Sequence, residues 1–233
     1  MEKVTIDYFS DILCIWAFSS QIRIEELRKN FGDKIRLNYR FIPIFGAAKI
    51  RIEETWREKG GLAGFNQHLH SLAVDWKHIT LHPQIWLQNE PASSTVAHLY
   101  LKAAQLLENN ARIPGQPHVE LNDRTLFEEL FWRIRCAFFE QNLNIAHIEV
   151  LDQIAAGLNI PIDEIHRLIN NGEAFSALHL DEEAKQNYQI PGSPTLVFNE
   201  GRQQLYGNVG YRIIEANIRE LLHNKQSGEA SWC

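Results

Sequence analysis

The chain has 233 residues, of which 45% are hydrophobic and 22% are charged, and its formal net charge is −6 at pH 7. This composition is typical of a globular protein and excludes a disordered or fibrous one. A negative surface offers no electrostatic attraction to nucleic acid or to an anionic membrane, and no apolar run is long enough to span a bilayer. We therefore expect neither nucleic acid nor a membrane as a partner.

The N-terminal part of the chain predicts a strand, a helix and a second strand. Residues 4–9 alternate between apolar and polar side chains, which is typical of a strand, and residues 35–42 repeat the pattern. Between them, the spacing of Ile24 and Leu27 indicates a helix. Together these elements predict a βαβ-like start.

The middle of the chain is mostly helical in pattern. The stretch from Gly46 to Pro91 has no clear helical or strand period. Its Trp76 and Trp86 are expected to cover the core rather than to line a pocket. Beyond it, apolar residues at helical spacing predict a series of helices. They run from Ser93 or Ser94 to about 107, from 126 to about 138, from Asn144 to Gly157, from Pro161 to about 171 and from Glu173 to about Tyr188.

The C-terminal part predicts a hairpin followed by a helix. Thr195–Phe198 and Gln203–Tyr206 are strand-like and are joined by the turn residues 199–201, and residues 211–222 form an amphipathic pattern. With the βαβ-like start, this order predicts an α/β fold in which a helical block interrupts a small mixed sheet flanked by helices.

Cys14 stands at the junction of the first strand and the first helix. Unpaired backbone N–H groups and the positive end of the helix dipole favour a thiolate there. Ala17 occupies the position where many redox proteins have a second cysteine, so no neighbouring thiol could release a mixed disulfide formed on Cys14. The alternative is that Cys14 is a buried, inert thiol.

The chain has three cysteines, which are too few and too scattered for a disulfide framework. The charged N-terminus also lacks the apolar core of a signal peptide, so we predict a cytoplasmic protein with reduced thiols. Cys136 is expected to pack in the helical block, and Cys233 ends the tail. Whether Cys136, Cys233 or an external thiol would resolve a disulfide on Cys14 stays open.

Two segments separated by the helical block carry a family resemblance. Ser10-Asp11-Ile12-Leu13-Cys14-Ile15-Trp16-Ala17-Phe18 and Gly192-Ser193-Pro194-Thr195-Leu196-Val197-Phe198, and more loosely Pro91-Ala92-Ser93-Ser94-Thr95-Val96-Ala97-His98, resemble the DsbA family of thioredoxin-fold proteins. The nearest branch is the FrnE-like and 2-hydroxychromene-2-carboxylate isomerase-like one, with kappa-class glutathione transferases nearby. The resemblance implies a discontinuous thioredoxin-like domain (1–45 and 173–225), an inserted all-helical domain (46–172) and a tail (226–233).

The resemblance also implies a site. Pro194 would be cis and would lie against the side chain of Cys14, with Trp16 and Ala17 flanking the same place. A cis proline would turn the N–H and C=O of Ser193 toward an extended thiol substrate, which could pair with them as a short added strand.

The chain departs from the family pattern at two places. Redox members carry Cys-Pro-Trp-Cys where this chain has Cys14-Ile15-Trp16-Ala17, and isomerase or transferase relatives carry serine in place of the cysteine. Gly207-Asn208-Val209-Gly210 matches a glutathione-binding turn of the isomerase-like relatives at Asn208, but not at the acidic and basic positions that follow. The alternative is a glycine-rich turn that leads into the next helix.

We therefore predict a thiol–disulfide oxidoreductase that uses Cys14 as a single nucleophile, with a small thiol or disulfide or a peptide as its substrate. The alternatives are a glutathione-dependent isomerase or transferase, and a non-catalytic binding protein that has kept the fold. We expect no tightly bound cofactor, with glutathione as a candidate co-substrate, and a homodimer stays open. His68, His70, His78 and His82 follow no common zinc spacing, so we expect no metal site.

Overall fold

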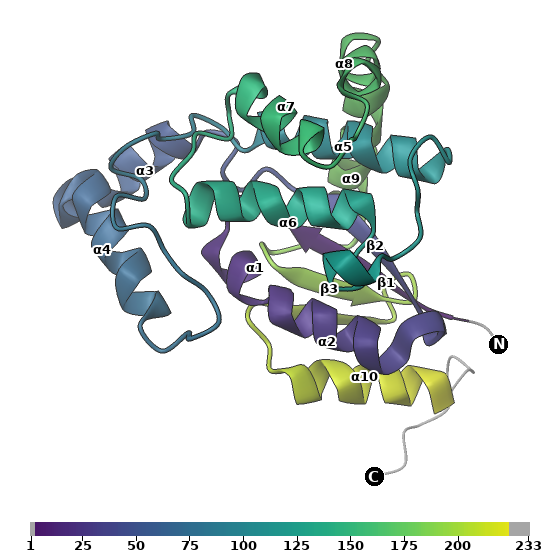
Figure 1. Ribbon diagram of the computed structural model, residues 1–233. Helices are drawn as coiled ribbons and strands as arrows, with labels where there is room; N and C mark the ends of the chain where they lie inside the picture. Colours follow the sequence, from purple (N-terminus) through teal and green to yellow (C-terminus); the bar gives the residue numbers. More distant parts are fainter. Residues whose placement is uncertain (1–2, 224–233) are drawn as a thin grey trace.

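The computed structural model describes residues 3–223 and contains a four-stranded sheet. Its strands are β1 (Val4–Ser10), β2 (Ile35–Phe41), β3 (Thr195–Phe198) and β4 (Gln203–Tyr206), in the spatial order β2-β1-β3-β4. β2 runs parallel to β1, whereas β3 is antiparallel to β1 and β4 is antiparallel to β3 (Figure 1). The predicted strands, the βαβ-like start and the small mixed sheet are confirmed.

The directions of β1 and β3 bring two distant segments to one end of the sheet. Phe9, near the end of β1, pairs with Thr195 at the start of β3. The residues that follow β1 therefore lie beside the residues that precede β3. The first group contains Cys14, and the second contains Ser193 and Pro194.

Three helices accompany the sheet closely. They are α1 (Ile15–Ser19), α2 (Gln21–Phe31), which continues into the short 3₁₀ turn η1 (Gly32–Lys34), and α10 (Tyr211–His223). In Figure 1, α2 and α10 lie side by side below the sheet, and the side chain of Asn30 donates a 2.7 Å hydrogen bond to the Tyr211 hydroxyl between them. α2 buries Ile24 and Leu27, as their spacing predicts.

The remaining helices form the block between β2 and β3. They are α3 (Ala48–Trp56), η2 (Arg57–Lys59), α4 (Gly61–Ala73), α5 (Thr95–Asn109), η3 (Val119–Leu121), α6 (Leu126–Phe139), α7 (Ile148–Ala156), α8 (Ile162–Asn170) and α9 (Glu173–Asn187). Figure 1 shows α3 and α4 projecting to one side, while α5, α6 and α9 lie close to the sheet. No helix within residues 3–223 is long and apolar enough to cross a membrane.

The structure corrects the start of one helix and fills the unassigned stretch. α7 begins only at Ile148, because the side chain of Asn144 accepts a bond from the N–H of Ala146 and makes a local turn before the helix. Between residues 46 and 91 the chain forms α3 and α4, whose mixture of charged and aromatic residues obscured the helical period.

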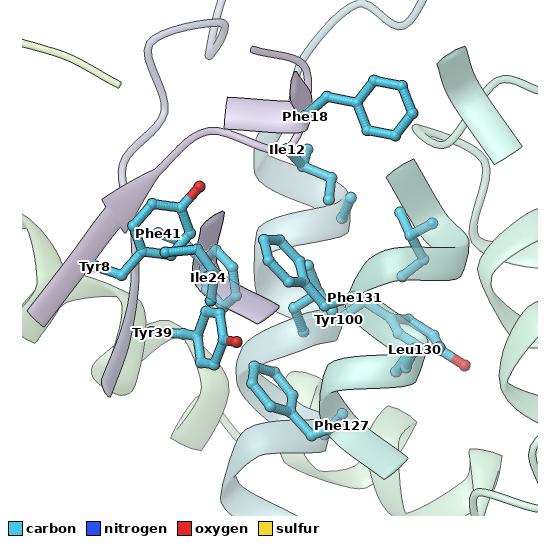
Figure 2. Packing of buried hydrophobic residues seen from close by; sticks show 14 of the residues in the cluster. Tyr8, Ile12, Phe18, Ile24, Tyr39, Phe41, Tyr100, Phe127, Leu130 and Phe131 are labelled. Carbon is cyan, nitrogen blue, oxygen red and sulfur yellow. The ribbon is translucent and has the colours of Figure 1, made fainter. Parts of the chain in front are cut away.

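One continuous core joins the sheet to the helical block. Figure 2 shows aromatic side chains of β1 and β2 pointing toward those of α5 and α6. The ring of Tyr39 meets the rings of Phe127 and Phe131 edge-on, each at 5.4 Å between centroids, and Phe41 meets Phe131 at 5.5 Å. Such edge-to-face pairs add to the free energy of burial. The block and the sheet are therefore packed together rather than hinged on a linker.

α9 covers part of the outer edge of β2 with a charged cluster. The carboxylate of Asp181 is fully buried and accepts a 2.8 Å hydrogen bond from the backbone N–H of Phe41. It also lies 2.5 Å from the ammonium of Lys102, on α5, and 3.2 Å from the guanidinium of Arg40. An edge strand with open hydrogen-bonding groups invites unwanted pairing, and this carboxylate satisfies one of those groups.

Replacing Asp181 tests this cluster. Asp181→Ala leaves the nearly buried ammonium of Lys102 without its anion, so the free energy of unfolding should fall by about 3 kcal/mol or more. The neighbouring variant Glu182→Ala removes only a partly exposed pair with Lys185 and should cost about 1 kcal/mol or less. Urea unfolding followed by circular dichroism measures both. Equal losses in the two variants would show that the cluster does not stabilise the fold.

Candidate functional site

Cys14 caps the start of α1 and faces the segment before β3. Its backbone N–H donates to the carbonyl of Asp11 at 3.2 Å, and its carbonyl accepts the first helical bond, from Phe18, at 2.9 Å. Its thiol donates to the carbonyl oxygen of Ser193, with Sγ and O separated by 3.2 Å. The peptide bond between Ser193 and Pro194 is cis. The cysteine and the loop before β3 are therefore in direct contact across 179 positions of sequence.

Asp11 holds the loop that carries Cys14. Its carboxylate is fully buried and accepts hydrogen bonds from the backbone N–H of Leu13 and of Phe45, both at 2.8 Å, and from the hydroxyl of Ser94 at 2.9 Å. Its own backbone N–H donates to the hydroxyl of Ser193 at 2.9 Å. One residue thus ties the cysteine loop to the chain after β2, to the start of α5 and to the loop before β3.

A buried histidine supports the same loop. Nε2 of His98 accepts a 3.1 Å hydrogen bond from the backbone N–H of Ile12, and its ring stacks on that of Phe41 at 5.4 Å. Burial, followed by the positive charges of Arg135 and Lys102, lowers the pKa of His98 to about 3. The ring is therefore neutral at physiological pH and carries its proton on Nδ1.

The ionisation of Cys14 differs from the prediction made from its position. Burial raises the pKa of the thiol above its ordinary value, and the nearby charge of Asp11 raises it further. Hydrogen bonds from the Ser193 side chain and from the backbone of Ala17 and Trp16 lower it, as expected at a helix start, but by less. The prediction that Cys14 is a thiolate is therefore wrong for the resting protein. Burial raises the pKa of Asp11 as well, to about 6.

Trp16 and Ala17 contribute to the site in different ways. The side chain of Trp16 is 36% exposed and meets Trp76 edge-on at 5.0 Å between ring centroids. Trp76 is half-buried and packs against the core as well as against Trp16, and Trp86 is buried in the core, as predicted for both. Ala17 is fully buried, and its carbonyl accepts a bond from the Ser20 hydroxyl at 3.0 Å. Trp16 is thus available to a ligand, and the Ala17 side chain is not.

Asn208 lies in the turn after β4 and contacts a cation. Its side-chain oxygen accepts a hydrogen bond from the guanidinium of Arg23, on α2. Arg23, Pro194 and Val209 share the lining of a small recess of about 10 Å³, which has room for one water-sized group. Another cavity, of about 360 Å³, is lined by residues of β2, α5, α6 and α9 and includes none of the predicted site residues.

Neither Cys136 nor the histidines weighed as metal ligands (His68, His70, His78 and His82) contact Cys14. Cys136 is half-buried on α6, and burial together with Glu140 raises its pKa to about 12. Cys233 lies outside the described residues. Within residues 3–223 no three residues that could ligate a metal come together. His78 bonds instead to the carbonyl of Ser19 at 2.8 Å, at the end of α1.

Asp11, His98 and Arg23 are the residues of this site that sequence reasoning did not select. Asp11 and His98 lie inside the segments that carry the family resemblance, and this membership was the signal that could have identified them as site residues. Nothing in the pattern around Arg23 distinguishes it from other arginines on a helix surface. Its partner, Asn208, is 185 positions away in the sequence.

The chain was compared with known families and structures. The DSBA-like thioredoxin domain model matches residues 5–219. Among solved structures, the chain is similar to a putative protein disulfide isomerase from Nitrosomonas europaea, with 20% identity, a TM-score of 0.68 and coverage of 95% of this chain and 97% of that chain. A search of curated proteins gave no match.

Two further structures show the same fold. The cytosolic disulfide reductase DsbM from Pseudomonas aeruginosa, solved with GSH, has 16% identity and a TM-score of 0.62, with 92% of this chain and 99% of that chain covered. A 2-hydroxychromene-2-carboxylate isomerase has 14% identity and a TM-score of 0.57, with 94% and 96% covered. At such identities the structural likeness shows only the fold, whereas the family model spans nearly the whole sequence. The chain belongs to the DSBA-like thioredoxin domain family.

Proposed function

We propose that this protein catalyses thiol–disulfide exchange with Cys14 as its single nucleophile. The contact between Sγ of Cys14 and the carbonyl oxygen of Ser193, at 3.2 Å, is the observation that carries the proposal. It places a sulfur beside a backbone group that can pair with an extended substrate. The exposed part of Trp16 supplies an apolar surface at the same place.

The exchange needs two steps and an external thiol. The Cys14 thiolate attacks one sulfur of a disulfide, so that a mixed disulfide forms on Cys14 and the other sulfur leaves as a thiolate. A second thiolate, from a small thiol such as glutathione, then attacks the mixed disulfide and regenerates the Cys14 thiolate. One disulfide is consumed and one is formed, so no other oxidant or reductant is required. Ala17 cannot act as the second thiol, and the external thiol takes that role.

When Cys14 loses its proton, the carbonyl oxygen of Ser193 loses its hydrogen-bond donor and can accept another one. The carbonyl oxygen of Ser193 accepts the bond from the thiol in the resting protein. Once Cys14 is a thiolate or is joined to a substrate, it has no proton to donate, and the Ser193 carbonyl can accept an N–H from that substrate. Attack and substrate pairing would therefore occur together.

The raised pKa of Cys14 favours a second candidate function. A thiol that stays protonated donates a hydrogen bond rather than attacking, and Cys14 already donates to Ser193. In a glutathione-dependent isomerase or transferase, such a group would orient the sulfur of a bound glutathione without becoming attached to it. The likeness to 2-hydroxychromene-2-carboxylate isomerase in fold is consistent with this alternative.

We also propose that the protein works in a reducing compartment with glutathione as co-substrate. Cys14 and Cys136 are both free thiols. The cytosolic disulfide reductase DsbM, solved with GSH, has a similar fold, and this likeness supports the proposal.

Replacing the sulfur of Cys14 distinguishes the two candidate functions. Cys14→Ser removes the nucleophile but keeps a hydroxyl donor, so disulfide exchange should fall to the uncatalysed rate. The matched variant Cys136→Ser should keep full activity, because that sulfur lies on α6, has no contact with Cys14 or Ser193 among its pKa determinants, and has a strongly raised pKa. Turnover of hydroxyethyl disulfide with glutathione measures both variants. Exchange that survives in Cys14→Ser would contradict the nucleophilic role.

The charge of Asp11 should control how readily Cys14 ionises. Asp11→Asn removes a negative charge that raises the pKa of Cys14, so alkylation by iodoacetamide at neutral pH should become severalfold faster and its midpoint should move to lower pH. The control, Asp33→Asn, changes an exposed carboxylate on η1 and should leave the profile unchanged. Circular dichroism checks that each variant folds.

The wild-type profile is a test that needs no variant. Because burial and Asp11 raise the pKa of Cys14, the midpoint of its alkylation should lie above that of a free cysteine, and exchange should accelerate as the pH rises through it. A midpoint below that of free cysteine would show that the helix start outweighs burial.

A further inference from the structure

Arg23 is a cation without an anionic partner beside the site. It lies in the first turn of α2 and is half-buried, and its guanidinium donates a hydrogen bond to the neutral side chain of Asn208. No carboxylate within residues 3–223 pairs with it, whereas Arg28 and Arg124 each pair with a glutamate. Removing a guanidinium from water without an anion is costly, so such a group is poised to bind one.

The position of Arg23 connects it to Cys14 through Pro194. Arg23 and Pro194 line the same recess, and the residue before Pro194 accepts the hydrogen bond of the Cys14 thiol. Pro194 therefore connects the recess that Arg23 lines to the residue that contacts the Cys14 thiol. The recess of about 10 Å³ has room for one oxygen-sized group beside Arg23, such as one oxygen of a carboxylate, although most of its other lining residues are apolar.

The surroundings increase the positive potential at Arg23. The first turn of α2 contains no acidic residue, and Ser20, at its N-cap, makes no side-chain capping bond there. The charge of the guanidinium is therefore not offset by a carboxylate in this turn. The turn that follows β4 has the uncharged residues Val209 and Gly210, so it supplies neither an acidic nor a basic side chain. Because the whole chain carries a net charge of −6, an anionic substrate needs such a local cation.

We propose that Arg23, oriented by Asn208, binds a carboxylate of the thiol or disulfide that reacts at Cys14. The inference rests on the proposed function and narrows its substrate to small thiols and disulfides that carry a carboxylate near the sulfur, of which glutathione is the obvious probe. Asn208 fixes the plane of the guanidinium and takes one of its donors. The other guanidinium donors are the ones that we expect to bind the carboxylate, because the fork geometry of a guanidinium matches that group.

Binding of an unreactive probe tests the inference separately from the chemistry. S-methylglutathione cannot form a disulfide, and calorimetry measures its affinity for the full-length protein. Arg23→Gln should weaken its binding about tenfold, as expected for the loss of a charge-assisted hydrogen bond. The control, Arg36→Gln, makes the same charge change on β2 opposite Thr5, at the other end of the sheet, and should leave binding unchanged.

A matched ligand shows that the carboxylate is the group recognised. The diethyl ester of S-methylglutathione should bind wild type about tenfold more weakly than the acid does, and Arg23→Gln should not weaken it further. Equal binding of acid and ester to wild type, equal effects of the two arginine variants, or no binding of the acid would each overturn the inference.

The reaction itself separates the two proposals. Hydroxyethyl disulfide is neutral, so its reaction with Cys14 depends on the proposed function but not on Arg23. If it reacts equally with wild type and with Arg23→Gln while oxidised glutathione reacts about tenfold more slowly with the variant, both proposals are supported. If neither disulfide reacts with wild type, the proposed function fails, and the calorimetry still decides the role of Arg23.

Discussion

The buried carboxylate of Asp11 determines where the sulfur of Cys14 lies. It accepts hydrogen bonds from Leu13, Phe45 and Ser94, which belong to different parts of the chain, and its backbone N–H bonds to the hydroxyl of Ser193. A buried carboxylate is costly unless its oxygens are satisfied, and these donors satisfy them. The same bonds fix the loop that carries the cysteine against the loop that carries Pro194.

The contacts that position the sulfur of Cys14 also make its thiol harder to ionise. The charge of Asp11 raises the pKa of Cys14, and so does the burial that brings the sulfur against Ser193. Backbone hydrogen bonds at the start of α1 lower the pKa of Cys14, but by less than burial and Asp11 raise it. A substrate that binds over Trp16 and Pro194 would change the surroundings of the sulfur, and deprotonation would remove the thiol's bond to Ser193. The resting protein thus holds a thiol with a raised pKa beside the backbone group that we propose pairs with a substrate.

Much of the fold could be predicted from the sequence because it depends on local periodicity. The strands alternate cleanly, and residues such as Ile24 and Leu27 mark a helix face. The contact between Cys14 and Ser193 came from family resemblance rather than from spacing. The ionisation of Cys14 could not be predicted, because it depends on burial and on a charge whose distance only the folded chain sets. The contact of Arg23 with Asn208 is equally non-local.

The most direct test of this account is to identify the cysteine to which a small disulfide becomes attached. Treatment of the protein with oxidised glutathione, followed by peptide mapping in a mass spectrometer, locates the modified cysteine. We expect one glutathione on Cys14 and none on Cys136, because only the former lies beside the backbone group that pairs with a substrate. Modification of Cys136 with Cys14 left free would contradict a reactive centre at the start of α1.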